Sequence, residues 1–504
     1  MCGIVGVWGD CSSSLIQSMK NKMIHRGPDA EGVSGGACWG LGHRRLSIMD
    51  IDGGNQPISS MKKGFQIAAN GEIYNHPQLS KKLKQIHNFS TRSDSETPLH
   101  LYEDIGVETA SKLDGMFSFI IANEKEFYAA RDVVGIKPLY YGSVGEALVF
   151  SSELKSFSGH ADSVKEFPPG TWFHSEKGFK KYSGIPRIQP EDRSIEEYCI
   201  LIRETLERAV VKRLMSDVPV GAFLSGGLDS SIIVALARKH VKQLHTFSVG
   251  IEGSPDIEAA RKVSKYLDTI HHEHIFTRKD ILDNLPEIIY YLESFDQDLV
   301  RSGIPCYFTS RLASDYVKVI LTGEGADELF AGYKYYKEVE KDDILHDELH
   351  RSVSTLHNLN LQRVDRLTMA HSVEARVPFL DLDFITAAQK IPSSLKLLRN
   401  TGKYPVEKWI LRKAFEDVLP GEIVWREKEQ FDEGSGTVDL LSAGLEQYMP
   451  ESEWPAYSNE YSSQKLRSFE EGVFHKIVSD VYSNPEIIYE NCARWEYQQL
   501  SNKV

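Results

Sequence analysis

The sequence is poor in cysteine and has neither a long apolar run nor an excess of positive charge. Its six cysteines are scattered over 504 residues without a CxxC spacing, which argues against a disulfide framework or a zinc site and favours a reducing cytoplasm. No window approaches the roughly 20 apolar residues that a membrane helix needs. The first residues contain no basic segment followed by a long apolar stretch, so we expect no signal peptide.

The charge balance is acidic. Lysine and arginine total 58 against 72 aspartate and glutamate residues, which gives a formal charge of −14. Because nucleic acids and anionic membranes bind cationic surfaces, we expect neither as a partner. A small basic pocket for phosphate groups remains compatible with this total. The apolar fraction of 41% and the charged fraction of 26% are those of a globular protein, and the length allows roughly two to four domains.

Residues 1–180 have the composition of a mostly β region, interrupted by one predicted helical stretch at 77–84. Runs of β-branched and aromatic residues alternate there with Gly, Asp and Asn turns. The segment 184–193 carries two prolines and several charges, which is typical of a linker. Ser194 and Glu197 then have capping-box spacing, ahead of apolar positions with a helical period. Strands are predicted at 4–8, 65–69, 116–122 and 147–151.

From residue 218 onward the pattern changes to alternating strands and helices. The continuous apolar run 218–224 is typical of a buried parallel strand, and further strands are predicted at 244–251, 271–276 and 318–322. Helices are predicted at 231–240 and from Ser254–Pro255, where serine precedes proline at the first helical position. Such alternation predicts a doubly wound parallel sheet. Residues 340–504 are predicted to be largely helical.

Cys2 combines a thiol with a free α-amine once Met1 is removed, and its small side chain normally allows that removal. The amine pKa of about 7.7–8.0 lies close to the thiol pKa of about 8.5, so proton transfer between the two groups is nearly thermoneutral. One residue can therefore supply both nucleophile and base, as in N-terminal nucleophile enzymes.

The motifs that accompany Cys2 are MCGIVG at 1–6, HRGPD at 25–29, HRRLSI at 43–48, NGEIYN at 70–75 and SDSE at 93–96. This ordered set closely resembles the class II (N-terminal nucleophile) glutamine amidotransferase domain. The resemblance implies an α+β fold of layered β-sheets with helices, and hydrolysis of glutamine at Cys2. Taken alone, Asn70–Gly71 is also typical of a plain hairpin turn.

The resemblance assigns a role to each polar position of these motifs. Asn70 and the Gly71 N–H would form the oxyanion hole, because attack on a carboxamide builds a negative oxygen that needs fixed donors. Arg45 would pair with the α-carboxylate of glutamine, a bidentate task suited to a guanidinium, and Asp94 would hold the α-ammonium. The glutamine pocket would be lined by Glu72 and by the backbone of Leu46, Ser47, Ile48 and Met49.

Three arginines and one aspartate stand apart from this set. Arg92 departs from the family pattern, because relatives often have glycine just before Ser-Asp, and a bulky cation there would alter the rim of the pocket. Arg26 and Asp29 are expected to brace a loop and stay outside the catalytic set. In the stretch EARVPFLD at 374–381, Arg376 is expected to be buried and paired.

The sequence SGGLDSS at 225–231 lies between a predicted strand and a predicted helix. Its glycines let the backbone approach phosphate, its hydroxyls donate, and the helix N-terminus adds a positive dipole end. It is not a Walker motif; it resembles the pyrophosphate loop of the N-type ATP pyrophosphatases. The ATP-binding residues that this resemblance implies are Leu224, Ser225, Gly226, Gly227, Asp229, Ser230, Val249, Thr322, Gly323 and Tyr333.

The sequence TGEGADE at 322–328 follows another predicted strand and resembles the acidic loop of the asparagine synthetases. Three carboxylates so close to the carboxyl end of a strand favour a ligand site over a solvated turn. Asp229 and Asp327 would hold Mg²⁺ on pyrophosphate, and Glu324 would take a proton from attacking ammonia. The resemblance also implies catalytic roles for Arg301 and for Lys428 in the segment 426–431.

These motifs together resemble the glutamine-hydrolysing asparagine synthetases from Met1 to about Gly436. The resemblance implies a glutaminase domain at 2–185 and an α/β doubly wound ATP pyrophosphatase domain at 194–504. Cys2 would release ammonia from glutamine, and the second domain would convert aspartate to β-aspartyl-AMP and then to asparagine. The small-molecule partners would be glutamine, aspartate and ATP with Mg²⁺, and the resemblance allows a homodimer.

Three other functions fit parts of the pattern. A β-lactam-type synthetase with a different carboxylate acceptor is one, although such relatives commonly lose Cys2 or the glutamine clamp, which are present here. Sugar-phosphate amination shares the glutaminase domain but needs no pyrophosphate loop. A non-enzymatic nucleotide sensor predicts a degraded site, whereas the main positions are all present. The weakly matching C-terminal region leaves the acceptor open.

Overall fold

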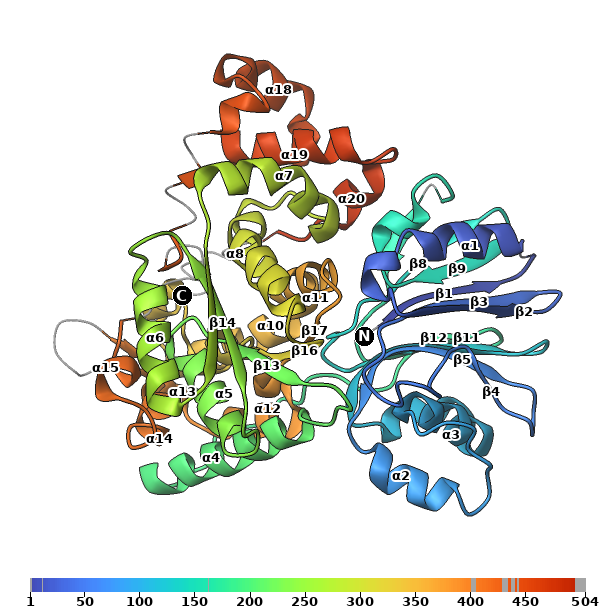
Figure 1. Ribbon diagram of the computed structural model, residues 1–504, viewed down its shortest axis with the longest axis horizontal. Coiled ribbons are helices and arrows are strands. Elements are labelled where there is room, and N and C mark those ends of the chain that lie inside the picture. The colour runs from blue at the N-terminus through green and yellow to red at the C-terminus, as the bar shows by residue number, and fades with distance from the viewer. Residues whose placement is uncertain are drawn as a thin grey trace.

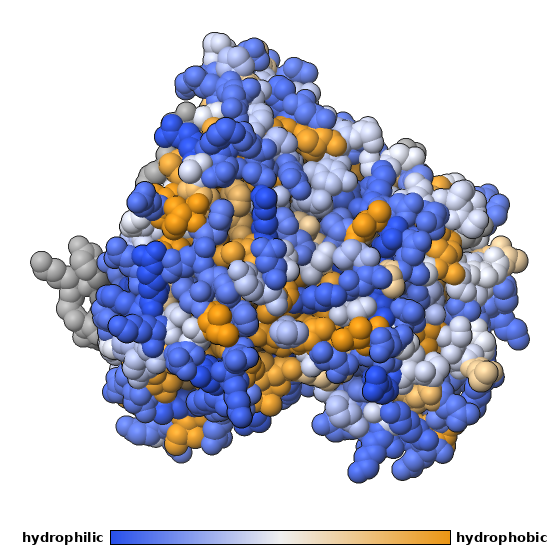
Figure 2. Space-filling view, in the orientation of Figure 1, coloured by the Kyte–Doolittle hydropathy of each residue, from blue (hydrophilic) through white to orange (hydrophobic). Residues whose placement is uncertain are grey.

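The chain folds into two units that lie side by side (Figure 1). The computed structural model describes residues 2–10, 12–161, 163–399, 405–427, 434–436, 440–441 and 444–494. The first unit runs from strand β1 to strand β12, and the second begins at helix α4. Within the described residues, no helix is both long and apolar enough to cross a membrane. The face drawn in Figure 2 is largely hydrophilic, with hydrophobic residues gathered mainly across the middle of the view.

Two six-stranded antiparallel sheets form the first unit. Apolar side chains from both sheets, among them Ile4, Leu41, Ala68, Ile120 and Phe150, pack into one buried cluster. One sheet has the order β10 (Val164–Glu166), β8 (Tyr140–Val144), β9 (Ala147–Ser151), β1 (Cys2–Trp8), β3 (Trp39–Arg45), β2 (Ala30–Gly35). The other has the order β12 (Gly178–Lys181), β11 (Thr171–His174), β7 (Phe127–Arg131), β6 (Gly115–Ala122), β5 (Gln66–Ile73), β4 (Ile58–Ser59).

The expectation of a single helical stretch in this region is wrong. Helix α2 (His76–Leu83) is the predicted one, but α1 (Ser13–Asn21) and α3 (Thr97–Ile105) accompany it. Consecutive serines such as those that begin at Ser12 are common in turns, but here the Ser12 side chain accepts the Leu15 N–H and caps α1. Helix α3 is buried along most of its length, including its polar residues Thr97, His100 and Glu103, so these residues do not form the solvent-exposed face of an ordinary surface helix.

An extended segment connects β12 to α4 (Ile195–Lys212). The predicted capping box is present, because the Ser194 hydroxyl accepts from the Glu197 N–H and the Glu197 carboxylate accepts from the Ser194 N–H. This reciprocal pair satisfies donors that a helix start leaves open.

The second unit is built on a five-stranded parallel sheet, as predicted. Its order is β15 (Ile270–Ile275), β14 (His245–Gly250), β13 (Val220–Phe223), β16 (Val319–Leu321), β17 (Glu374–Arg376). The chain moves outward from β13 to β15 and then returns to the other side of β13 at β16. This reversal creates a crevice beyond the carboxyl ends of β13 and β16, which is where open α/β sheets bind ligands. Both predicted phosphate-site loops start there.

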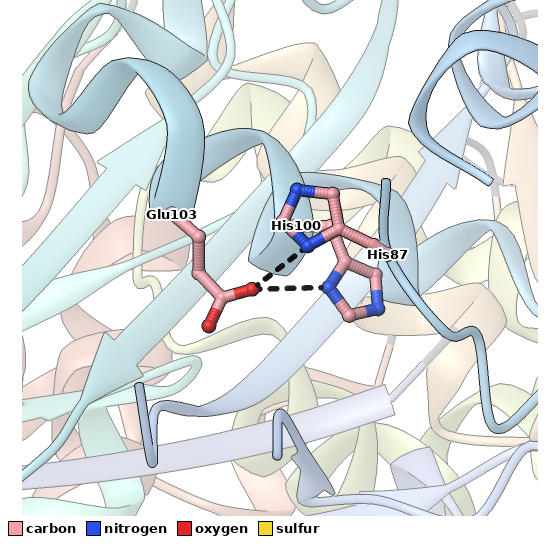
Figure 3. A group of neighbouring side chains, drawn as sticks. All are labelled: His87, His100 and Glu103. Carbon is pink, nitrogen blue, oxygen red and sulfur yellow. Dashed lines mark hydrogen bonds and ion pairs between the residues drawn. The ribbon is translucent and has the colours of Figure 1, made fainter. Parts of the chain in front are cut away.

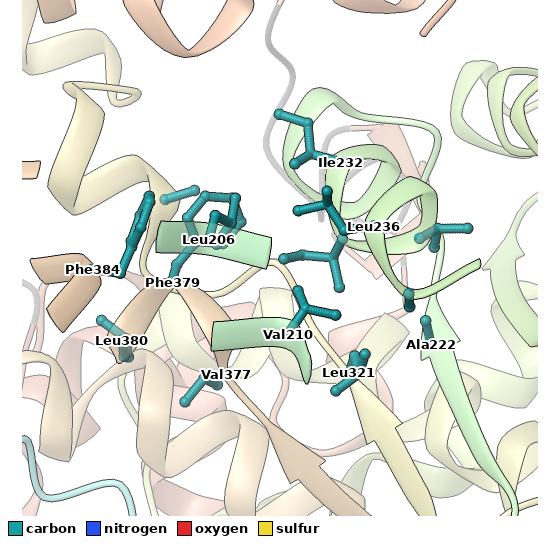
Figure 4. Close-up of a cluster of buried hydrophobic side chains, with 14 of the residues drawn as sticks. Leu206, Val210, Ala222, Ile232, Leu236, Leu321, Val377, Phe379, Leu380 and Phe384 are labelled. Atoms are coloured by element: carbon teal, nitrogen blue, oxygen red, sulfur yellow. The ribbon is translucent and has the colours of Figure 1, made fainter. Parts of the chain in front are cut away.

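Helices cover both faces of this sheet. On one face, Leu206 and Val210 of α4 and Ile232 of α5 pack with Leu321 of β16 (Figure 4). On the other, Ile320 packs against α8 and α11. The remaining helices are α5 (Leu228–Arg238), α6 (Pro255–Leu267), α7 (Arg278–Leu292), α8 (Gln297–Ser314), α9 (Ala326–Phe330), α10 (Asp342–Ser354), α11 (Asn360–Met369), α12 (Leu382–Gln389), α13 (Ser393–Lys396), α14 (Trp409–Ala414), α15 (Gly421–Val424), α18 (Trp454–Glu460), α19 (Phe469–Val481) and α20 (Glu486–Asn491).

Among the described residues after 340, the predicted helical character holds, with two exceptions. Strand β17 extends the sheet, and β18 (Leu397–Leu398) pairs with β19 (Val406–Glu407). Strand β17 has the sequence Glu-Ala-Arg, which carries no β signal. Its position depends on the burial of both charged side chains between the two units, an arrangement that only the tertiary structure creates.

A buried ion network joins the units. Arg26 of the first unit lies 2.8 Å from Glu153 and 2.7 Å from Asp365 of α11. The next residue of α11, Arg366, pairs with Glu293 at 2.8 Å. Both arginines are fully buried. Removing one partner from such a pair typically costs about 3–5 kcal/mol, because a charge is left uncompensated. The network therefore fixes the relative position of the units.

Candidate active sites

Cys2 is the first residue of β1 and lies opposite Arg45 of β3. It is buried, with 7% of its surface exposed. Its N–H donates to Asn70 Oδ1 at 2.9 Å, and its carbonyl accepts from Arg26 Nε at 3.0 Å. Burial raises the pKa of the thiol, while the Leu46 N–H and the Arg45 guanidinium favour the thiolate. The backbone on both sides of the thiol is thus fixed by side chains from other elements.

Asn70 and Gly71 lie inside strand β5, so the hairpin-turn alternative is excluded. Asn70 is fully buried, and within the described part of the chain its Nδ2 has no hydrogen-bond partner. Gly71 has φ +131°, and a Cβ there would lie 1.9 Å from the Met116 carbonyl. An unsatisfied buried amide is costly unless a ligand completes it. The structure therefore brings a free donor next to Cys2.

Arg45 is held by the loop that follows it. Its guanidinium donates to the carbonyls of Met49, Asp50 and Ile51 at 3.1, 2.6 and 2.9 Å. Leu46, Ser47 and Ile48 are buried and Met49 is half-buried. Asp29 accepts the Ser47 N–H at 2.7 Å and pairs with Lys318 of the second unit, also at 2.7 Å. Arg26 and Asp29 are thus bracing residues, as expected.

Three buried acids, Glu72, Asp94 and Glu374, interact with one another on the side of the first unit that faces β17. Burial raises the pKa of Asp94 to about 6, with help from Glu374 and despite a hydrogen bond from the Ile73 N–H. Burial and the charges of Asp94 and Glu374 raise the pKa of Glu72 well above its usual range. Arg376 lies 2.6 Å from Glu374 and 3.3 Å from Glu72, so it is buried and paired as predicted. These acids and Arg376 form one buried ion network.

A buried network of histidines and carboxylates supports the loop that carries Asp94 (Figure 3). Glu96 accepts hydrogen bonds from the backbone N–H and the hydroxyl of both Ser90 and Thr91. His100 Nε2 lies 3.1 Å from Glu96, and its Nδ1 lies 3.2 Å from Glu103. Burial raises the pKa of Glu96, but these hydrogen bonds outweigh it and lower the pKa to about 2. The network therefore holds residues 90–91 on their buried side.

His87, His100 and Glu103 could be considered as metal ligands, because their ligand atoms lie within 4.8 Å of one another. Each imidazole nitrogen, however, already faces a carboxylate. His87 lies 3.2 Å from Glu103 and 2.9 Å from Asp104, and His100 lies between Glu103 and Glu96. We therefore interpret the group as a network of hydrogen bonds and ion pairs that stabilises the Asp94 loop.

The SGGLDSS loop joins β13 to α5, with Gly227 as the helix N-cap. Gly226 has φ +73°, and a Cβ there would lie 2.4 Å from the Ala260 backbone nitrogen. Ser225 Oγ lies 3.1 Å from Ser230 Oγ and accepts from the Gly227 N–H at 3.3 Å. The loop is therefore a tight turn that presents N–H groups and hydroxyls at a helix start, the arrangement that binds phosphate.

Lys408, a residue that the sequence analysis missed, lies between the two carboxylates expected to hold Mg²⁺. Its Nζ is 2.5 Å from Asp229 and 2.6 Å from Asp327. Lys408 is buried and has φ +55°, immediately before α14. The two aspartates raise its pKa despite burial. No motif marks this lysine, because its position depends on chain segments that are more than 80 residues apart.

The loop after β16 packs onto the phosphate loop, since a Cβ on Gly323 would lie 2.9 Å from Asp229 Cβ. Glu324 forms an ion pair with Arg363 of α11. Thr322 Oγ1 accepts from the Glu324 N–H at 3.4 Å. The Tyr333 hydroxyl donates to Glu328 at 2.5 Å, and burial together with the Asp327 charge raises the pKa of Glu328 to about 7.

The other positions predicted for the second site have different surroundings. Leu224 and Val249 are buried in the apolar clusters on either side of the sheet. Arg301 lies on α8 and donates from Nε to Glu470 of α19 at 2.9 Å. This contact connects α8 to α19, in the C-terminal region that the sequence resemblance reached only weakly. Lys428 lies outside the described residues.

Helix α11 contacts both sites. Arg363 pairs with Glu324 on the second unit's side, and Asp365 pairs with Arg26, whose Nε contacts the carbonyl of Cys2. Residues two positions apart point to nearly opposite faces of a helix. One helix therefore separates the two sites and is bonded to each.

Comparisons with known proteins agree with this arrangement. A family model described as glutamine amidotransferase domain matches residues 1–177, and one described as asparagine synthase matches residues 201–344 and 337–475. The chain is 40% identical to asparagine synthetase (glutamine-hydrolyzing) of Zea mays, with 89% of this chain and 80% of that one covered. It is also 40% identical to asparagine synthetase (glutamine-hydrolyzing) 2 of Oryza sativa subsp. japonica, with 86% and 78% covered.

The fold and the two sites define the class: an N-terminal nucleophile glutamine amidotransferase unit joined to a doubly wound unit of the ATP pyrophosphatase type. The family-model matches and the similarity to full-length relatives narrow this class. The chain belongs to the glutamine-hydrolysing asparagine synthetase family.

We expect glutamine hydrolysis to lose efficiency in acid as Asp94 is protonated. The pKa of Asp94 is raised to about 6, so below that pH the carboxylate that should hold the glutamine ammonium becomes neutral. The value of kcat/KM for glutamine should then fall by about tenfold for each pH unit. In Asp94→Asn, kcat/KM for glutamine should be low and should change little over the same pH range. A wild-type profile without this acid limb, in protein shown to stay folded by its melting temperature, would contradict the assignment.

We expect Lys408→Met to impair the second site selectively. Removing the cation leaves Asp229 and Asp327 without this shared partner, so aspartate-dependent exchange of pyrophosphate into ATP should fall by about a hundredfold. Glutamine hydrolysis should persist, which shows that the first unit is folded. Lys413→Met, on the exposed side of α14, is the matched control. Unchanged exchange in Lys408→Met would remove this lysine from the site.

Proposed function

We propose that this chain makes asparagine from aspartate, with glutamine as nitrogen donor and ATP as energy source. The glutaminase domain comprises residues 2–185 and the synthetase domain residues 194–504. The two family-model matches and the extended segment before the Ser194 cap support this division. The observation that carries the proposal is the buried Asn70 Nδ2, a donor without a protein partner among the described residues, directly beside Cys2.

In the first domain, the Cys2 sulfur attacks the side-chain amide carbon of glutamine. Asn70 Nδ2 and the Gly71 N–H donate to the oxygen that becomes negative, a contribution typically worth about 10²–10³ in rate. Ammonia leaves with a proton and a thioester remains. Water then attacks the thioester, which releases glutamate and restores the thiol. With Met1 removed, the Cys2 amine is the base that carries the proton, and Asn70 Oδ1 orients this nitrogen.

In the second domain, the aspartate side-chain carboxylate attacks the α-phosphorus of ATP, which gives β-aspartyl-AMP and pyrophosphate. The SGGLDSS loop binds the phosphates through its N–H groups and hydroxyls. Ammonia then attacks the acyl carbon, AMP leaves, and asparagine forms. Glu324 accepts the proton that the ammonia nitrogen loses, and Arg363 positions it. Lys408 neutralises phosphate charge, a role that Lys428 is proposed to share.

The residues present fit a divalent cation. Asp229 and Asp327 already converge on one positive atom, Lys408 Nζ, and carboxylate oxygens are the ligands that Mg²⁺ prefers. Mg²⁺ held there with the pyrophosphate group would supply further neutralisation of phosphate charge. We also propose that the enzyme works in the cytoplasm, which is supported by the free state of the described cysteines, Cys2, Cys38, Cys199, Cys306 and Cys492.

The test is to incubate the protein with glutamine, aspartate, ATP and Mg²⁺ and to measure asparagine, pyrophosphate and glutamate. Asparagine and pyrophosphate should appear in equal amounts. Cys2→Ala should lose glutamine-dependent synthesis by at least about 10³-fold, because the nucleophile is gone, yet retain synthesis from ammonium salts. Cys38→Ala is the matched cysteine control. If no asparagine forms with either nitrogen source, the proposed function is wrong. If Cys2→Ala still uses glutamine, the assignment of Cys2 as nucleophile is wrong.

A further inference from the structure

Two loops carry the residues proposed to bind the two ends of glutamine. Loop 46–51 holds Arg45 through its carbonyls, and loop 90–94 ends at Asp94. Arg92 and Asp50 connect these loops. The Arg92 N–H donates to Asp50 Oδ2 at 2.8 Å, while its Nε and Nη2 reach Asp50 Oδ1 at 3.3 and 3.2 Å. The Asp50 side chain is 4% exposed and that of Arg92 is 82% exposed.

The backbone of Asp50 is engaged as well. Its φ is +49°, a left-handed conformation that aspartate tolerates better than most residues. In this conformation its carbonyl accepts from Arg45 Nη2 at 2.6 Å and from the Gly54 N–H at 2.9 Å. Its N–H donates to Asp217 of the second unit at 2.7 Å. Asp50 thus contacts the Arg45 side chain, the Asp94 loop and the synthetase domain.

We propose that Arg92 and Asp50 are positioning residues that hold Arg45 and Asp94 at the spacing of an α-amino acid and thereby set the affinity for glutamine. The proposal rests on the glutaminase function proposed above. The ammonium and carboxylate of glutamine are a fixed distance apart, so two loops that are already connected to each other lose less freedom on binding than two independent loops. Neither side chain is among the residues proposed to act on the amide of glutamine, which are Cys2, Asn70 and Gly71.

Different residues support loop 90–94 on its buried side and on its solvent side. Glu96 and His100 hold residues 90–91 from the buried side, whereas Arg92 acts from the solvent side. Because Arg92 is exposed, its side-chain contacts should be screened by salt, unlike the buried network. Salt dependence therefore separates this pair from the general stability of the loop.

The first experiment measures steady-state glutamine hydrolysis by Arg92→Ala. The KM for glutamine should rise by about threefold to tenfold, with kcat within twofold of wild type, as expected for loss of a partly exposed charged contact. Arg92→Lys keeps the charge but not the forked geometry, so its KM should be intermediate. Raising the ionic strength should increase the wild-type KM toward that of Arg92→Ala and change the variant less.

The second experiment tests the pair itself. Asp50→Asn keeps an acceptor and tolerates φ +49°, and it should raise the KM at least as much as Arg92→Ala. The double variant should resemble Asp50→Asn rather than show the product of the two effects, because both changes remove one contact. Arg187→Ala, which removes another exposed arginine, paired with Asp347, controls for net charge and should leave the KM unchanged.

The outcomes are distinct. A wild-type protein that hydrolyses glutamine, combined with an unchanged KM or a reduced kcat in Arg92→Ala, would overturn the positioning role and leave the proposed function intact. Multiplicative effects in the double variant would overturn the pairing. A wild-type protein that hydrolyses no glutamine but makes asparagine from ammonia would overturn both the glutaminase assignment and this inference. Ammonia-dependent synthesis in each variant confirms that the chain is folded.

Discussion

The arrangement of the two sites depends on the contacts of one buried side chain, the Arg26 guanidinium. Its guanidinium contacts the Cys2 carbonyl, Glu153 of the same unit and Asp365 of the second unit, and it is fully buried. A buried guanidinium is stable only when its donors are satisfied. The position of Cys2, the proposed nucleophile, is therefore coupled to the docking of the second unit. If the units separated, Arg26, which contacts the Cys2 carbonyl, would lose Asp365 as a partner.

This constraint agrees with the chemistry proposed for the chain. Ammonia that escapes to water is protonated and no longer attacks an acyl group, so a two-site amidotransferase benefits from a dry, fixed junction. Helix α11 supplies that junction: Arg363 reaches Glu324, and Asp365 reaches Arg26. Both contacts come from one rigid element, and a shift of the helix would disturb both sites together. Rigid docking rather than a flexible hinge is what the buried charges at this interface favour.

Much of this could be predicted from the sequence, for identifiable reasons. Strand ends followed by SGGLDSS and TGEGADE predicted the crevice of the second unit, because parallel strands place their carboxyl ends at one edge. The capping box at Ser194 is local and was correct. Lys408 and β17 could not be found, because long-range packing alone gives them a role. Helix α3 was missed since it is buried nearly all round, and Arg92 was noticed only as a departure from the family pattern.

In both sites the charged groups proposed to bind substrate already have partners within the protein. Asp229 and Asp327 share Lys408, Glu324 pairs with Arg363, and the Arg45 guanidinium is held by backbone carbonyls. Substrates must replace or extend these contacts, so each binding free energy is a difference between similar interactions. The advantage of this arrangement is preorganisation. Charged groups that are paired within the protein keep their positions for the reaction, so little reorganisation is needed. Asn70 Nδ2 differs from these charged groups, because no protein acceptor among the described residues meets it, and the oxygen that it is proposed to bind becomes fully charged only during the reaction.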